Sequence, residues 1–229
     1  MSRWIVSVDL GQTIDPTAIA VLEITTRQDA VMAQYDDPPG PTPPSLDWFS
    51  TTTDGGPRQP NTPARIDVRH LERLPLRMPY TEQVARVAKL LARSPLSRRA
   101  DLVLDQTGVG RPVVDMFRAA GLSPIGCTIT GGDSWSRVQG DDYRVAKLLL
   151  VSRLQAALHA GELRIAKDLP DASILALEMA DFRAQIGETG YTRFGAREGT
   201  HDDLVLALAI GVWYANLESN VLTMHTLFI

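Results

Sequence analysis

The chain has 229 residues, of which 44% are hydrophobic and 22% charged, a composition typical of a globular protein with a sizeable core. A formal net charge of −4 excludes a polycation that binds nucleic acid over its whole surface. Cys127 is the only cysteine, which rules out an internal disulfide and a cysteine-based zinc site. Asp9 interrupts the first apolar run too soon for a signal peptide, and no run reaches the roughly 18 apolar residues of a membrane helix. We therefore expect a soluble cytoplasmic protein.

Two short runs near the N-terminus predict a pair of β-strands. Residues 4–10 form an apolar run that carries Asp9 at its end, as a buried strand does when it delivers a carboxylate to a sheet edge. After a turn at Asp15 and Pro16, residues 17–25 are rich in β-branched and apolar side chains. A hairpin is the simplest connection between two such strands.

Residues 35–64 interrupt this pattern. Eight prolines fall between positions 35 and 63, together with Gly40, Gly55 and Gly56, and they exclude a regular helix or a central strand. We interpret the segment as a surface insertion. It serves either as a flap that guides DNA or binds a partner, or as a loop that the fold tolerates.

The remaining elements mix strands and helices. Residues 66–74 alternate apolar and polar side chains like a half-exposed strand, and residues 81–92 place their apolar side chains on one helical face. Beyond them the pattern predicts strands at 101–105, 124–129 and 163–165, helices at 113–120, 143–160 and 202–217, a loop at 131–137, and no definite element over 174–184. This order predicts one α/β domain over residues 1–229, with a mixed central sheet in which parallel strands extend an antiparallel meander.

Acidic residues stand at three ends of these elements. Asp9 ends the first strand, Asp105 ends the fourth, and Asp202 and Asp203 open the last long helix. Taken singly, each is also typical of a turn or a helix cap. Strand ends and a helix N-terminus can meet at one edge of an α/β sheet, and carboxylate oxygens are the ligands that hard cations prefer. Two such ions clamp a scissile phosphodiester, so the sequence predicts a catalytic site for two Mg²⁺ or Mn²⁺ ions.

Three motifs carry a resemblance to a known family. They are residues 6–12 (VSVDLGQ), 105–110 (DQTGVG) and 201–209 (HDDLVLALA), which together span nearly the whole chain. With them the sequence resembles the nuclease domain of phage large terminases and, more loosely, RuvC-like resolvases. The resemblance implies an RNase H-like fold whose acidic cluster cuts concatemeric viral DNA during genome packaging.

The resemblance also implies roles for single residues. Asp9 would bridge the two metal ions, Asp105 would bind one of them, Asp203 matches the resolvase-type aspartate, and Asp202 is a second ligand or an orienting neighbour. His201 either positions water or phosphate or is a plain helix-entry residue.

The implied partners are double-stranded DNA, an ATPase domain or chain and other packaging proteins, in the cytoplasm of a bacterial host. Large terminases carry the ATPase ahead of the nuclease, and no G-x-x-x-x-G-K-[ST] loop occurs in this sequence. The chain is therefore either an excised domain or a standalone relative.

Other functions stay open at the level of sequence. Residues 9–13 (DLGQT) resemble the first phosphate loop of actin-like and sugar-kinase phosphotransferases, but those proteins need two copies of the domain, and 229 residues hold no repeated D-x-G element. A Holliday-junction resolvase would share the metals and require a dimer. A catalytically silent DNA-binding module is disfavoured because every expected carboxylate is present.

A basic stretch predicts where DNA lies. Residues 65–99 contain nine basic and three acidic residues, a local excess of positive charge in an acidic chain. Arg69, Arg73 and Arg77 are the expected phosphate contacts, with Arg144 and Lys147 as further candidates. The alternative is a solvated basic face.

Overall fold

The structure is a computed structural model that describes residues 2–11, 13–26, 63–138, 140–181, 183–186, 192–195 and 201–225. The predicted insertion at 35–64 lies outside the described residues except for its last two positions, which belong to a strand.

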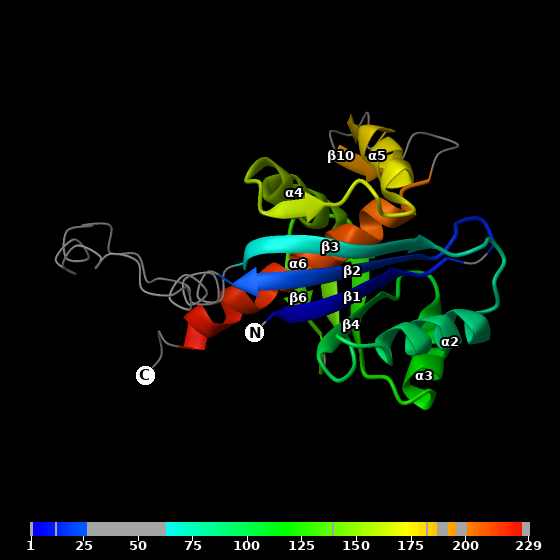
Figure 1. Cartoon of the computed structure of the whole chain (residues 1–229). Helices are drawn as coiled ribbons and strands as arrows, with labels where there is room; N and C mark the ends of the chain where they lie inside the picture. The colour runs from blue at the N-terminus through cyan, green and yellow to red at the C-terminus, as the bar shows by residue number, and fades with distance from the viewer. Residues whose placement is uncertain are drawn as a thin grey trace, which may run out of the picture.

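Eight strands form one mixed sheet in the order β6-β7-β5-β4-β1-β2-β3-β8 (Figure 1). Their bounds are β1 (Arg3–Asp9), β2 (Ala18–Thr26), β3 (Pro63–Arg73), β4 (Ala100–Asp105), β5 (Pro124–Thr130), β6 (Trp135–Arg137), β7 (Tyr143–Ala146) and β8 (Leu163–Ile165). The first three strands are an antiparallel meander, and β4, β5 and β7 extend it in parallel from β1. The predicted hairpin and the predicted mixed α/β sheet are thus confirmed.

Helices cover both faces of the sheet. The helix α2 (Tyr80–Leu91) and the helix α3 (Gly110–Ala119) pack on one face, and α4 (Lys147–His159) and α6 (Asp203–His225) pack on the other. A further helix, α5 (Ala172–Asp181), contacts α6 and stands on the same side as α4 (Figure 1). A separate two-stranded sheet consists of β9 (Arg183–Ile186) and β10 (Thr192–Gly195).

The helix that the sequence predicts at 143–160 begins four residues later in the structure, at Lys147. Tyr143 and Val145 alternate into the core under α6 while Arg144 is exposed on the opposite face, which is the period of a strand. These residues form β7, and α4 begins at Lys147. The predicted loop at 131–137 likewise contains an edge strand, β6, which pairs antiparallel with β7. The two strands are too short to show a clear alternation of side chains, and the long apolar helix that follows dominates the sequence pattern.

The helix α6 lies unusually close to the sheet. Its residues are buried without interruption from Asp203 to Ala215, as expected for a helix that is apolar on all sides. Close approach is possible because Gly211 has no side chain. A Cβ added there would lie 2.6 Å from a methyl carbon of Leu22 and 2.6 Å from the Ser7 hydroxyl oxygen. The contact fixes the position of α6, and hence of its first residue, over β1 and β2.

Gly211→Ala is expected to lower the melting temperature, although alanine usually stabilises a helix relative to glycine. The added methyl group overpacks the contact with Leu22 and Ser7, at a cost of about 1–3 kcal/mol. The matched control is Gly131→Ala, because a Cβ at Gly131 meets nothing within 4 Å. Thermal unfolding checks both variants, and a Gly211→Ala protein at least as stable as the wild type would contradict the close packing.

Candidate metal centre

The alternation of side chains along the strands brings Asp9 and Asp105 to one face of the sheet. Ile5 on β1 and Val103 on β4 lie an even number of residues before them, and both pack in the core shared with α4 and α6. β1 and β4 are parallel neighbours whose register places the two aspartates side by side at the strand ends. A strand order that joins distant parts of the chain thus creates a pair of carboxylates.

A third carboxylate comes from the first turn of α6. Asp203 lines, with Asp9 and Asp105, a cavity of about 440 Å³ at this edge of the sheet. The three residues are only 3%, 9% and 6% exposed, respectively. Three carboxylates of like charge therefore meet where little water reaches them.

Burial and repulsion change the acidity of Asp9. Loss of hydration raises its pKa well above the usual value, and the negative charges of Asp105, Asp203 and Asp202 raise it further. A hydrogen bond with the carboxyl group of Asp105 acts in the same direction. Without a cation, the cluster therefore favours a proton on Asp9.

Asp105 is oriented by the turn that follows β4. Burial raises its pKa, and hydrogen bonds from Thr107 oppose that rise. The backbone N–H of Thr107 donates to Asp105 Oδ1 at 2.8 Å, while the Thr107 hydroxyl oxygen accepts a bond of 2.7 Å from the backbone N–H of Ile129. The turn is thus attached to β5, and the carboxylate has one defined direction.

Asp203 has an oxygen that suits a cation. Burial raises its pKa to about 6, against the opposing charges of Arg73 and His201. Its Oδ2 atom is buried and accepts no hydrogen bond from the described part of the chain, and the nearest guanidinium nitrogen of Arg73 is 3.5 Å away. A buried acceptor without a donor needs an explanation, and a metal ion in the cavity supplies one. The residues present therefore fit a divalent cation.

Glu178 on α5 holds the first turn of α6 and Arg73 together. It is buried, its Oε2 atom accepts a hydrogen bond of 3.0 Å from the backbone N–H of Val205, and its other oxygen accepts one from the Arg73 guanidinium. Because the bond from Val205 caps the helix that begins at Asp203, Glu178 contributes to the placement of that carboxylate.

Asp202 differs from Asp203 in its partner. Its Oδ2 atom lies 2.9 Å from Nζ of Lys147, the first residue of α4, and both residues line the cavity. The Lys147 charge also opposes the rise in the pKa of Asp105. Asp202 is thus engaged by a cation of the protein itself, whereas the oxygen without a hydrogen-bond donor belongs to Asp203.

Asp15, in the turn between β1 and β2, and His201, just before α6, add two groups beside Asp203. Asp15, His201 and Asp203 place one ligand atom each within 4.8 Å of one another. Nδ1 of His201 is 3.4 Å from Asp15 Oδ1 and 3.8 Å from Asp203 Oδ2. The side chains of Asp15 and His201 are largely exposed, so this group faces solvent on one side.

A buried polar network fixes that turn. A Cβ at Gly11 would lie 2.1 Å from the carbonyl oxygen of Asp15, so the chain closes on itself there. The Thr17 hydroxyl accepts a hydrogen bond from the Gly11 N–H and lies 2.8 Å from Oε1 of Gln83. Gln83, on α2, donates to the carbonyl oxygens of Gly11 and Met78. The loop beside the carboxylates is therefore anchored to α2.

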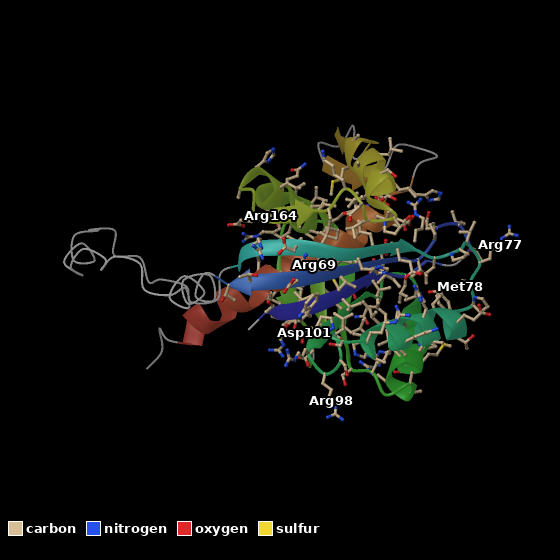
Figure 2. The ribbon with its side chains drawn as sticks, viewed as in Figure 1. Arg69, Arg77, Met78, Arg98, Asp101 and Arg164 are labelled. Carbon is tan, nitrogen blue, oxygen red and sulfur yellow. The ribbon has the colours of Figure 1, made fainter. Side chains whose placement is uncertain are left out.

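The predicted DNA contacts are scattered. Arg69 binds Glu23 at 2.7 Å, and Arg73 is engaged with Glu178, so neither guanidinium is free. Arg77 follows β3 and points away from the protein (Figure 2). Arg144 lines a second cavity and Lys147 the one described above. Their contacts with DNA stay predictions.

Sequence patterns do not single out Asp15, Glu178 or Gln83. Asp15 precedes a proline, a pattern that predicts only a turn. Its turn directly follows the strand that ends at Asp9, however, and this position in the sequence could have indicated that Asp15 lies near the metal centre. Glu178 stands in a segment whose apolar pattern is indistinct, and Gln83 looks like a surface position of an amphipathic helix. Their burial depends on contacts between distant parts of the chain.

Solved structures with a similar fold include large terminase nucleases. The large terminase nuclease of thermophilic phage G20c with bound magnesium is 18% identical, with a TM-score of 0.59 over 92% of this chain and 80% of that chain. The large terminase nuclease domain of Thermus phage P74-26 is 17% identical, with a TM-score of 0.56 over 92% and 78%. The human cytomegalovirus terminase nuclease domain, soaked with manganese, is 9% identical, with a TM-score of 0.51 over 96% and 86%.

These likenesses define the fold. The chain has the RNase H-like fold of large terminase nuclease domains, as its sequence resemblance implied. No protein-family model and no curated protein matches the sequence. None of the helices in the described part of the chain is long and apolar enough to cross a membrane.

Asp9→Asn is expected to raise the melting temperature of the metal-free protein near neutral pH. An acid with a raised folded-state pKa destabilises the fold increasingly as the pH rises from its unfolded pKa of about 3.9 towards the folded-state pKa, and the penalty is absent below the unfolded pKa. The advantage of the variant should therefore vanish near pH 4 and grow as the pH rises. Each kcal/mol corresponds to about 2–4 °C for a chain of this size.

Thermal unfolding with a chelator at several pH values measures this difference. Asp168→Asn is the matched control, because Asp168 is exposed and lies outside the cavity. An Asp9→Asn protein that melts at or below the wild-type temperature at every pH would show that the carboxylates do not repel one another as described.

Proposed function

We propose that the chain is an endonuclease that hydrolyses DNA phosphodiester bonds with two divalent metal ions. The observation that supports this most strongly is the meeting of Asp9, Asp105 and Asp203 in one open cavity. Each comes from a different element, all three are buried, and Asp203 Oδ2 lacks a hydrogen-bond donor among the described residues. Such a set is costly for a fold unless a cation offsets the repulsion.

Mg²⁺ or Mn²⁺ is the cofactor that fits these ligands. Hard cations take carboxylate oxygens, and the chain offers Asp9 and Asp105 for one ion and Asp9 with Asp203 for another. Two ions in such a site activate the attacking water and stabilise the leaving oxygen of a phosphodiester. The G20c nuclease with bound magnesium or cobalt and the manganese-soaked cytomegalovirus domain share the fold, which supports this choice.

The chain's own residues would perform the remaining tasks. Thr107 fixes the direction of the Asp105 carboxylate, and Glu178 fixes the start of α6 and so the place of Asp203. Lys147 neutralises Asp202 and stands in the cavity, where its ammonium group can approach a substrate phosphate. His201, just before α6, is placed to bind water or phosphate beside Asp15.

The biological setting that we infer is viral genome packaging. The structural neighbours are terminase nucleases, and the match to the longer large terminase of another thermophilic bacteriophage covers 92% of this chain but only 39% of that one. A nuclease of this kind would act on concatemeric double-stranded DNA beside an ATPase domain or chain. A resolvase would use the same metal ions, so a terminase-type nuclease and a resolvase are distinguished by the DNA substrate that each cuts.

Loss of one buried carboxylate should abolish cutting. Asp9→Asn, Asp105→Asn and Asp203→Asn each remove a metal ligand, and we expect plasmid cleavage to fall roughly hundredfold or more. Asp202→Asn should be milder, because Asp202 is occupied by Lys147. Nicking of supercoiled plasmid with Mg²⁺, with Mn²⁺ and with a chelator measures the effect.

Asp168→Asn serves as the control, since it removes an exposed carboxylate outside the cavity. Substantial cleavage by all three buried-site variants would overturn the proposal, as would cleavage by the wild type that persists in chelator. Preference for four-way junctions over plasmid would favour the resolvase. ATP hydrolysis that Asp9→Asn abolishes would favour the phosphotransferase.

A further inference from the structure

A second cavity lies beside the metal centre, and arginines line it. It has a volume of about 590 Å³, and its wall includes Arg111 and Arg118 from α3 and Arg144 from β7. We call it the arginine cavity. Gln106 is the one residue of the motif at 105–110 that lines it, and only Arg144 is among the DNA contacts predicted from the sequence.

The arginine cavity and the catalytic cavity share a wall. Asp105 and Thr107 line the catalytic cavity, and Gln106 between them lines the arginine cavity. On β5, Ile129 lines the first and Thr128 the second. A hydrogen bond of 3.2 Å from Gln106 Nε2 to the Thr128 hydroxyl joins the two segments. Successive residues of a strand point to opposite faces, so the two cavities adjoin each other around the carboxyl ends of β4 and β5, and a DNA strand that bends around this edge would contact both.

Two of the three arginines are available to a ligand. Arg118 binds Asp115 at 3.0 Å, and this pair cancels its own charge. Arg111 and Arg144 are exposed, and neither guanidinium group has a hydrogen bond or an ion pair with any residue that the structure describes. Asp142 is the other carboxylate of the wall, so the cavity retains a net positive charge.

Five of the nine basic residues at 65–99 are exposed and have no ion pair among the described residues, but none of them lines either cavity: Arg77, Lys89, Arg93, Arg98 and Arg99. The other four are bound to carboxylates, namely Arg65 to Asp67, Arg69 to Glu23, Arg73 to Glu178 and Arg86 to Glu72. A cation already paired gives up that pairing when it binds a phosphate, which offsets much of the gain. The arginine cavity has no such cost at Arg111 and Arg144.

We propose that the arginine cavity binds a backbone phosphate of the DNA strand being cut, through Arg111 and Arg144. The inference rests on the proposed nuclease function and adds the path of its substrate. A guanidinium group pairs with phosphate oxygens through two parallel hydrogen bonds and stays charged at any relevant pH. Phosphates recur along the strand, so a contact beside the scissile bond positions that bond over the carboxylates without reading sequence.

The test is the steady-state cleavage of duplex DNA by the double variant Arg111→Ala/Arg144→Ala at several salt concentrations. We expect KM to rise roughly tenfold with kcat nearly unchanged, because binding is weakened while the metal ligands are intact. The log–log dependence of kcat/KM on salt should become shallower by roughly 0.9 for each lost contact. Arg111→Lys/Arg144→Lys should keep most of the salt slope, because it keeps both charges.

Arg164→Ala is the matched control. Arg164 is an exposed arginine whose guanidinium group has no hydrogen-bond or ion-pair partner among the described residues, on β8 at the opposite edge of the sheet (Figure 2). It should change neither KM nor the slope. If the wild type cuts DNA and the double alanine variant has the wild-type KM and slope, the arginine cavity is not a phosphate site and the nuclease proposal stands. If the wild type cuts no DNA with either metal, the nuclease proposal fails, and this inference fails with it.

Discussion

Asp9, Asp105 and Asp203 are buried together although their negative charges repel one another in surroundings of low dielectric constant. The fold holds them there by contacts that the three carboxylates do not make themselves. The close contact of Gly211 with Ser7 and Leu22 fixes α6 on the sheet, and Glu178 caps the helix at the end that carries Asp203. The buried network around Gln83 fixes the turn on the other side. These contacts thus hold the three carboxylates together against their mutual repulsion, which a bound divalent cation would reduce.

The basic side chains around the metal centre are of two kinds, those paired with a carboxylate and those that are not. Lys147 and Arg73 stand close to Asp202 and Asp203 and balance part of their charge. On the opposite face of the sheet, Arg111 and Arg144 have no such carboxylate partner among the described residues. A chain with a net charge of −4 can therefore attract a polyanion locally, since field and contact depend on where the charges lie rather than on their sum.

The strands that carry the chemistry could be predicted because their signals are local. The apolar runs before Asp9 and Asp105, and the apolar helix after Asp203, each mark an element end with a carboxylate, and the side-chain period places them on one face. The short strands β6 and β7 were missed because three or four residues carry too little periodicity beside α4. Glu178 and Asp15 were missed because their roles arise from contacts across the fold. The pairing of Arg69 with Glu23 likewise depends on the register of β2 and β3, which composition does not reveal.

The central claim is that these three carboxylates hold divalent cations. Anomalous diffraction from crystals grown with Mn²⁺ tests it most directly, because the ion itself is located. We predict two peaks in the cavity, held by the carboxylates of Asp9, Asp105 and Asp203, with Lys147 still paired to Asp202. An empty cavity at saturating Mn²⁺, with the Asp203 oxygen still without a partner, would contradict the account.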